Sequence, residues 1–281
     1  MPLNRNSVGH RMGPHTHRYD WRDCVLYALG VGAGVDELQY VYERELQVIP
    51  SFGLSAIFEL LAELAMVTEM DMRGIVHGEQ DIVFHDVLPP GGEFHTEGVV
   101  QQLLDKGKDK GALVIAESTT ADAKGKKLFT STVSVYSRFD GGFGGENVSS
   151  PAFEFPERAP DHVVPDHPSP NQAALYRLSG DVHPLHIDPE FAKLVGFDAP
   201  ILHGLCTYGY ACRAAIKALA GGDVANLRRL SCRFTSPLYP GQPNETRIWE
   251  VEEGRALFRV VNAQNGDILL DRGVMETGPP A

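Results

Sequence analysis

The stretch from Leu205 to Leu219, LCTYGYACRAAIKAL, decides the fold. Its fifteen residues are mostly apolar or small, and Gly221 and Gly222 follow it, as glycines commonly do at the end of a helix. This pattern predicts a largely buried helix. Short runs punctuated by turn residues come next, and they predict antiparallel strands at 230–234, 245–252, 256–263 and 268–277.

The first half of the chain has the same order of elements. It predicts a helix at 54–65 and strands at 78–84, 93–106, 111–121 and 127–137. Three short matches between the halves are 149 to 151 residues apart, and in the clearest of them F-x3-L-x-P-G begins at both Phe84 and Phe234. The constant order and offset favour a duplicated unit over chance matches among common residue types. We therefore predict an α+β fold with two tandem antiparallel sheets, each wrapped around a central helix.

A segment rich in glycine and proline separates the two halves. It begins with FDGGFGG at Phe139 and continues with six prolines among acidic residues, the last of them Pro170. This is the composition of loops and linkers. We place an N-terminal domain at 1–149, a linker at 150–170 and a C-terminal domain at 171–281.

The overall composition excludes several classes of protein. With 25 Lys and Arg against 37 Asp and Glu, the formal net charge of −12 argues against nucleic-acid and anionic-membrane partners. No apolar run approaches the roughly 18 residues of a membrane span. There is no secretory signal pattern, and the C-terminal Gly278–Ala281 is not a peroxisomal address, so we expect a cytoplasmic location. The cysteines form no CxxC pair and read as free, buried thiols: Cys24, Cys206, Cys212 and Cys232.

The densest group of polar and titratable residues is YRLSGDVHPLHIDP, from Tyr176 to Pro189. Asp181 and His186 are five residues apart with Pro184 between them, so the segment is not a regular helix, and a turn can aim both side chains at one point. Two other interpretations stay open. One is ordinary turn and helix-capping chemistry. The other is a metal site with three ligands, His183, His186 and Asp188.

A second chemical feature, APILHGL from Ala199 to Leu205, leads directly into the predicted buried helix. Gly204 would leave the first backbone N–H groups of that helix unobstructed, and the helix dipole favours negative charge there. This arrangement suits an oxyanion site. The alternative is a helix entry that needs a small residue for packing, as Gly53 would provide in the first half.

Together these two segments resemble the hydratase 2 signature of MaoC-like (R)-specific enoyl-CoA hydratases. The first half, with HGEQ from His77 and FDGGFGG from Phe139, looks like the N-terminal domain of the two-domain members. The resemblance thus covers essentially the whole chain and implies a double hot dog fold. It also implies that Asp181 and His186 are the catalytic pair and that the amide of Gly204 binds the thioester oxygen.

The resemblance extends to the residues around this pair, with one departure. The usual Asn of the Gly-Asp-x-Asn-Pro run is His183 here, which could act as a donor in its place or change the pH dependence. We expect five residues to contact substrate: Tyr176, Ser179, His183, His203 and Arg233. Because coenzyme A is polyanionic and the protein is acidic, its binding also needs a local basic patch. The candidates are Arg213, Lys217, Arg228, Arg229 and Arg233.

The activity implied is the reversible hydration of trans-2-enoyl-CoA to (3R)-hydroxyacyl-CoA in fatty-acyl or sterol side-chain metabolism. The substrate would be a thioester of coenzyme A or acyl carrier protein, with no cofactor and no metal, and the chain could form a homodimer. The first half reads GVGAG from Gly30, where the second carries the catalytic pair, so we expect it to leave room around Phe58 for a bulky acyl chain. A hot dog thioesterase and a non-catalytic acyl-thioester-binding subunit stay open as alternatives.

Overall fold

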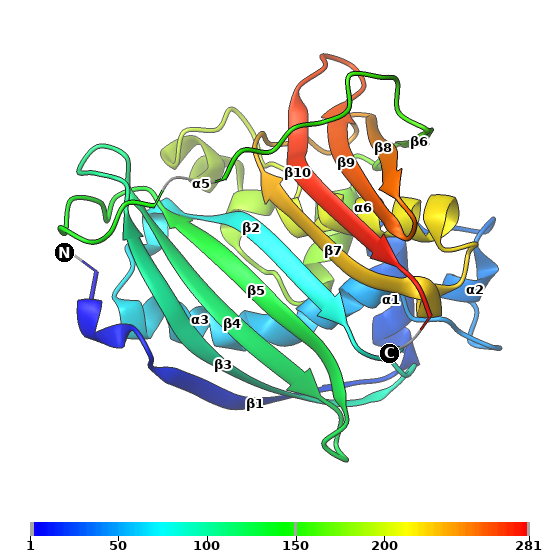
Figure 1. The fold of residues 1–281 in the computed structure, drawn as a ribbon, viewed down its shortest axis with the longest axis horizontal. Helices are drawn as coiled ribbons and strands as arrows, with labels where there is room; N and C mark the ends of the chain where they lie inside the picture. Colours follow the sequence, from blue (N-terminus) through cyan, green and yellow to red (C-terminus); the bar gives the residue numbers. More distant parts are fainter. Residues whose placement is uncertain (1–2, 149–150, 280–281) are drawn as a thin grey trace.

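In the computed structural model, which describes residues 3–148 and 151–279, the strands form a single antiparallel sheet that curves around the helices (Figure 1). Its ten strands follow the order β1-β3-β4-β5-β2-β7-β10-β9-β8-β6. The α+β class is confirmed, but the two expected sheets are joined edge to edge into one. The domain boundary at 149/150 and the last two residues of the chain lie outside the described residues, and the domain limits stay a prediction.

All eight strands expected from the sequence are present, and two more flank them. The first half contributes β1 (Arg11–Tyr19), β2 (Ile75–Phe84), β3 (Gly92–Asp105), β4 (Ala112–Ala121) and β5 (Lys127–Ser137). The second half contributes β6 (His162–Asp166), β7 (Leu227–Phe234), β8 (Asn244–Glu252), β9 (Arg255–Asn262) and β10 (Ile268–Thr277). The unexpected strands, β1 and β6, are the two edges of the sheet. Each contains a proline, Pro14 or Pro165, which an edge strand tolerates and a central strand does not.

The helices lie within the curve of the sheet and at one end of it (Figure 1). The predicted buried helix is α6 (Gly204–Leu219). The helix predicted at 54–65 consists of two parts, a 3₁₀ segment η2 (Pro50–Ile57) and then α3 (Phe58–Thr68). The other α-helices are α1 (Trp21–Gly30), α2 (Leu38–Val41), α4 (Gln172–Tyr176) and α5 (Pro189–Leu194). Short 3₁₀ turns complete the set: η1 (Arg5–Ser7), η3 (Met72–Gly74), η4 (Arg177–Ser179), η5 (Pro184–His186) and η6 (Val224–Asn226).

The two halves meet where β2 pairs with β7. At the centre of this antiparallel pairing Asp81 lies opposite Ser231, 150 residues later. That separation equals the offset between the sequence repeats, so equivalent strands pair about a local two-fold axis. The strand order on both sides of the seam is the same, which agrees with duplication. Ion pairs reinforce the seam: the Arg229 guanidinium donates to the Asp81 carboxylate at 2.9 and 2.7 Å, and Arg233 donates to Glu79 at 2.7 Å.

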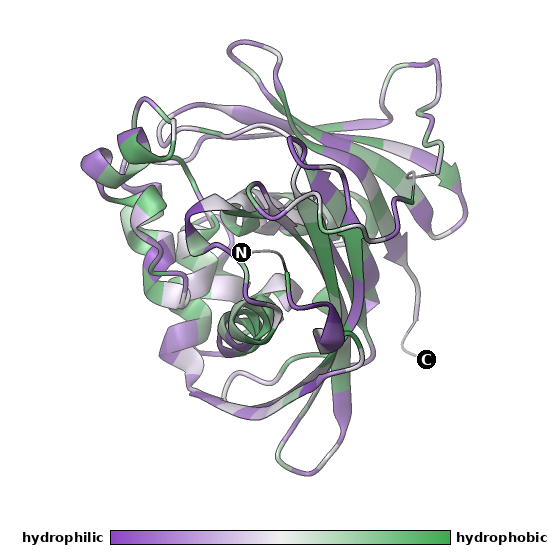
Figure 2. Ribbon diagram, turned by 90° about the vertical axis from the view of Figure 1, so that its left-hand side faces the viewer, coloured by the Kyte–Doolittle hydropathy of each residue, from purple (hydrophilic) through white to green (hydrophobic). Residues whose placement is uncertain are grey.

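The main hydrophobic core fills the space between the concave face of the sheet and the helices. Figure 2 shows apolar residues on a helix seen end-on inside this curve and on the strands around it. Tyr208 of α6 is fully buried, and its hydroxyl donates to the Leu230 carbonyl on β7 at 2.6 Å. The four cysteines are free and buried, as expected.

One helical run, Pro50–Thr68, is long and apolar enough to cross a membrane by composition alone. Most of it is buried inside the protein. Leu54, Ile57 and Leu64 along this run are each at most 1% exposed and pack in the core clusters. The run is therefore a core helix of the fold, which accounts for its apolar composition.

Gly32 lies just after the end of α1 and packs against α6. A substitution at this position tests how tightly the first half packs on that helix. Gly32 has a φ of +83°, and a Cβ there would lie 2.3 Å from the ring of buried Tyr210 on α6. We expect Gly32→Ala to lower the free energy of unfolding by about 2–3 kcal/mol, because strain and overpacking add. Gly34→Ala is the matched control, since its Cβ would meet nothing within 4 Å. Urea unfolding measures both, and equal midpoints for the two variants would contradict this packing.

Candidate active site

A cavity of about 880 Å³ lies between the two halves, next to the start of α6. Its volume is typical of sites that enclose a small molecule. Much of its wall is apolar and comes from the first half: Phe58, Leu61, Met72, Ile75, Val76 and Leu113. The site residues expected from the sequence line it from the second half: Asp181, His183, His186 and Gly204.

His186 has one ring nitrogen free for proton transfer. Its Nδ1 lies 2.9 Å from the Ile201 carbonyl, and because a carbonyl only accepts, Nδ1 carries the proton. In the neutral ring Nε2 is therefore unprotonated. Burial lowers the pKa of His186 below its usual value, although the Asp181 carboxylate acts in the opposite direction. The neutral form, which can act as a base, is thus favoured.

Asp181 is positioned by the turn that precedes it and by a contact from the first half. Gly180 has a φ of +123°, a conformation that favours glycine, and a Cβ there would lie 2.8 Å from the Phe58 ring. The Asp181 side chain accepts a hydrogen bond from the backbone N–H of His183 at 3.2 Å. The Ser-Gly-Asp turn therefore holds the Asp181 carboxylate, which agrees with the turn interpretation of the sequence. Asp181 also lines the cavity.

His203 contacts both catalytic candidates, His186 through its ring and Asp181 through a hydrogen bond. Its ring stacks on His186 with centroids 3.8 Å apart, and its Nε2–H donates to the backbone carbonyl of Asp181 at 3.1 Å. Burial, together with the neighbouring His186, lowers the pKa of His203 to about 3. The ring is therefore neutral, and its second nitrogen, Nδ1, is buried without a partner among the described residues.

The residues that could hold a metal differ from those expected. One ligand atom from each of Asp181, His186 and His203 lies within 4.8 Å of the other two. The sequence suggested Asp188 as a ligand, but Asp188 caps α5 instead, where its carboxylate accepts from the Glu190 N–H at 2.8 Å. Because each histidine already donates to a backbone carbonyl, each keeps one nitrogen for a ligand or a proton.

Gly204 is the first residue of α6 and borders the cavity. Backbone N–H groups in the first turn of a helix have no partner within the helix, and the dipole makes this end positive. Phe234 of β7 covers the glycine so closely that a Cβ would lie 2.8 Å from its ring. Gly204 therefore borders the same cavity as Asp181 and His186, at the helix end where an oxyanion site would use its N–H.

The comparison with known proteins accounts for both halves of the chain. Residues 17–139 match the model of the MFE-2 hydratase 2 N-terminal domain, and residues 152–271 match the model of the MaoC like domain. A 3-hydroxyacyl-thioester dehydratase Y from Mycobacterium tuberculosis is 38% identical, over 98% of this chain and 99% of its own. The chain belongs to the MaoC-like hydratase 2 family.

Further relatives of this hydratase 2 family member agree in sequence and fold. A probable enoyl-CoA hydratase 2 from Dictyostelium discoideum is 36% identical, over 95% of this chain and 94% of its own. The crystal structure of a MaoC-like dehydratase from Phytophthora capsici superposes with a TM-score of 0.88 at 32% identity, covering 98% of both chains. A Mycobacterium tuberculosis protein described as a double hotdog fold superposes with a TM-score of 0.59 at 15% identity, covering 97% of both chains. The double hot dog expectation is confirmed.

His183, the departure from the family signature, keeps a role in the turn. Its Nδ1 accepts a hydrogen bond from the Leu185 N–H at 3.3 Å, a bond that an asparagine oxygen could also accept. Burial lowers the pKa of His183, so the ring is neutral and the proton is on Nε2. His183 thus leaves an N–H donor at the cavity wall, as an asparagine amide would.

The other predicted substrate-binding residues lie in different places. Arg233 borders the cavity and pairs with Glu79 across the seam. Tyr176 and Ser179 are absent from the described residues that line the cavity, and so is His203. The ring of Tyr176 packs 4.9 Å from that of His203, so these two rings lie behind the cavity wall.

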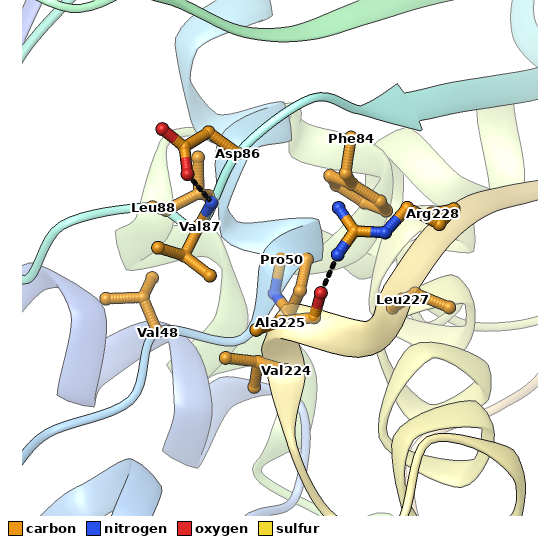
Figure 3. A pocket seen from close by; sticks show the side chains of 10 residues that line it. All are labelled: Val48, Pro50, Phe84, Asp86, Val87, Leu88, Val224, Ala225, Leu227 and Arg228. Atoms are coloured by element: carbon orange, nitrogen blue, oxygen red, sulfur yellow. Dashed lines mark hydrogen bonds between the residues drawn. The ribbon is translucent and has the colours of Figure 1, made fainter. Parts of the chain in front are cut away.

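Four of the five candidate residues of the basic patch already have partners within the protein. Arg213 is half-buried and pairs with Asp166 and Glu37, whereas Lys217 is exposed. Arg229 pairs with Asp81 in the seam. Arg228 donates to the Ala225 carbonyl beside a hollow of only about 10 Å³ (Figure 3). A hollow of that size holds about one water molecule and no part of a nucleotide.

His77 is a cavity residue that the sequence analysis did not identify as functional. It lies on β2 in the first half and borders the cavity together with Asp181. The HGEQ motif drew attention only as part of a family resemblance. A histidine near the start of a strand carries no local signal of a site, because Asp181 and Phe234, which line the cavity with it, are more than 100 residues away in sequence.

Proposed function

We propose that this protein catalyses the reversible addition of water to trans-2-enoyl-CoA, giving (3R)-hydroxyacyl-CoA. The observation that carries the proposal is the grouping of the Asp181 carboxylate, the unprotonated Nε2 of His186 and the Gly204 amide around one cavity. Family membership supports the same reaction class, because relatives are named for hydration of enoyl-CoA and for its reverse, dehydration of 3-hydroxyacyl thioesters.

The geometry supports a simple division of roles. A water molecule bound between Asp181 and His186 attacks C3 of the enoyl group while His186 Nε2 takes one of its protons. The electrons of the C2–C3 double bond shift toward the thioester oxygen, where the Gly204 N–H stabilises the developing charge. The enolate then collapses, and C2 receives the proton held by the pair. One water is added across the double bond, and dehydration follows the same path in reverse.

Several finer points belong to the proposal. The His186 tautomer supports this residue as the base, with Asp181 orienting the water. The (3R) configuration and coenzyme A as the carrier rest on the family alone. The apolar wall from the first half supports a long or branched acyl chain. A cytoplasmic location stays a prediction, since relatives include bacterial and peroxisomal proteins.

The central test replaces each member of the pair. We expect Asp181→Asn and His186→Gln to lower kcat by at least about 10²-fold, because general acid–base catalysis contributes this much. Loss of the enoyl-thioester absorbance band of crotonyl-CoA measures the rate. Asp109→Asn, an exposed carboxylate in a turn, is the control and should leave the rate unchanged.

Three outcomes would count against the proposal. Near-normal turnover in both variants would remove the pair from the mechanism. Release of free thiol by the wild type would indicate a thioesterase, and binding of crotonyl-CoA without turnover would indicate a non-catalytic subunit.

The His183 position has its own test. We expect His183→Asn to keep kcat within about tenfold of the wild type, because asparagine can accept the bond from the Leu185 N–H and also carries an N–H donor. The pH profile should lose any contribution from this histidine. A loss comparable to that of Asp181→Asn would show instead that the imidazole itself takes part in the reaction.

Acyl-chain preference tests the role of the first half. We expect Leu61→Ala to raise the kcat/KM ratio of octenoyl-CoA to crotonyl-CoA by about tenfold, because the shorter side chain enlarges the space for a longer acyl chain beside the apolar wall. Leu61 is a better choice than Phe58, which also supports Gly180. Met66→Ala, on the exposed face of the same helix, is the control. An unchanged ratio would mean that the chain lies elsewhere.

A further inference from the structure

An irregularity in β2 brings a first-half histidine to the reaction centre. The pairing register of β2 with β5 shifts between His77 and Glu79, as at a β-bulge, which re-aims a side chain. Gly78 occupies the shift, where a Cβ would lie 2.9 Å from the Ser134 carbonyl oxygen. The backbone at this point thus requires glycine, and His77 borders the cavity.

Gln80 fixes which nitrogen of His77 carries the proton. The Gln80 amide Nε2 donates to the Ser131 hydroxyl at 2.8 Å and to the Asp81 carbonyl at 3.2 Å. Its Oε1 therefore faces His77, 3.1 Å from His77 Nε2. An amide oxygen only accepts, so His77 Nε2 is the donor. Gln80 is fully buried, which holds this arrangement in place.

The ring of His77 is neutral. Burial lowers its pKa to about 4, although Gln80, the charge of Asp181 and the backbone of Glu79 act in the opposite direction. A neutral imidazole carries a single proton, and here that proton is on Nε2. Nδ1 is consequently an acceptor with a lone pair.

The surroundings of His77 belong to the reaction centre. Its ring packs edge-on against Phe234 with centroids 4.9 Å apart, and Phe234 in turn covers Gly204. His77 therefore lies beside the ring that covers Gly204, lines the same cavity as Asp181 and is close enough to feel its charge. In a bound enoyl thioester, the acyl carbons, the sulfur and the carbonyl oxygen near this region carry no hydrogen that can be donated. The only donor on the reacting part is the water, or the hydroxyl that it becomes on C3.

We propose that His77 is a substrate-positioning residue supplied by the half that lacks the catalytic pair: its Nδ1 accepts a hydrogen bond from the water that adds to C3 and from the resulting 3-hydroxyl. This inference rests on the proposed function. The water has two O–H groups: one gives its proton to His186 Nε2, and the other is shared between the Asp181 carboxylate and His77 Nδ1 and stays on C3 as the hydroxyl. Sharing the second O–H restricts the orientation of the water and directs its lone pair toward C3. The first half is then part of the reaction centre as well as a wall.

Three replacements separate the possible roles of the ring. His77→Asn places an amide oxygen or nitrogen where Nδ1 lies and removes the bond to Gln80. His77→Gln reaches the position of Nε2 and keeps that bond, but removes the acceptor at Nδ1. His77→Phe keeps an aromatic ring against Phe234 but removes both the bond to Gln80 and the acceptor at Nδ1. Thermal unfolding of each variant identifies those that are folded, and kcat and KM are then measured with crotonyl-CoA and with 3-hydroxybutyryl-CoA.

We expect His77→Asn to stay within about threefold of the wild-type kcat, and His77→Gln and His77→Phe to lose about tenfold or more in both directions, since one hydrogen bond is lost. A fully active His77→Gln variant would overturn the inference and assign the ring to supporting Gln80. A fully active His77→Phe variant would overturn it in favour of packing alone. Should one of these two fail to fold, the other still decides.

A binding measurement identifies the partner of Nδ1. Butyryl-CoA has neither the double bond nor the hydroxyl, so its Kd should be unchanged in His77→Gln. A Kd weakened by tenfold would overturn the inference, because the contact would then lie on the coenzyme A arm. The two proposals fail differently: a wild type without turnover overturns both, whereas an active wild type with an active His77→Gln variant overturns only this one.

Discussion

The pairing of β2 with β7 is the constraint on which the rest of the molecule depends. Equivalent strands of the two halves join edge to edge, so one continuous sheet curves around the helices of both halves. The cavity lies between the two halves. The seam also brings Glu79 and Arg233 together at the rim of this cavity. The chemistry thus lies at the junction of the halves, where neither half alone could build a complete site.

The two halves have diverged in what they supply around this junction. The second half keeps the turn that presents Asp181 and His186, while the first half reads GVGAG after the equivalent tyrosine. The first half nevertheless acts on the site through Phe58, which packs against Gly180 and so supports the turn that holds Asp181. The first half thus supports the site by packing although it has no counterpart of the segment with Asp181 and His186.

The sequence predicted the parts of this molecule that have strong local periodicity or a long motif. The buried helix and eight strands could be predicted because their apolar patterns and turn residues agree. The proline-containing turn drew attention to Asp181 and His186, but only the family resemblance assigned them as a catalytic pair. The edge strands were missed because Pro14 and Pro165 read as loop signals. The candidate basic patch stays a prediction, and charge in the sequence does not reveal that Arg213 and Arg229 are already paired with acids from distant segments. Tyr176 and Ser179 are near Asp181 in sequence, but side-chain direction at a turn is set by tertiary packing.

The edges of the sheet have a consequence for how copies of this protein meet. A ten-stranded sheet that does not close into a barrel ends in two strands with unpaired backbone groups, and such strands invite pairing with another chain. Here each edge carries a proline, which lacks an N–H donor and interrupts any added ladder. The same prolines that obscure β1 and β6 in the sequence therefore protect the protein against aggregation by strand addition.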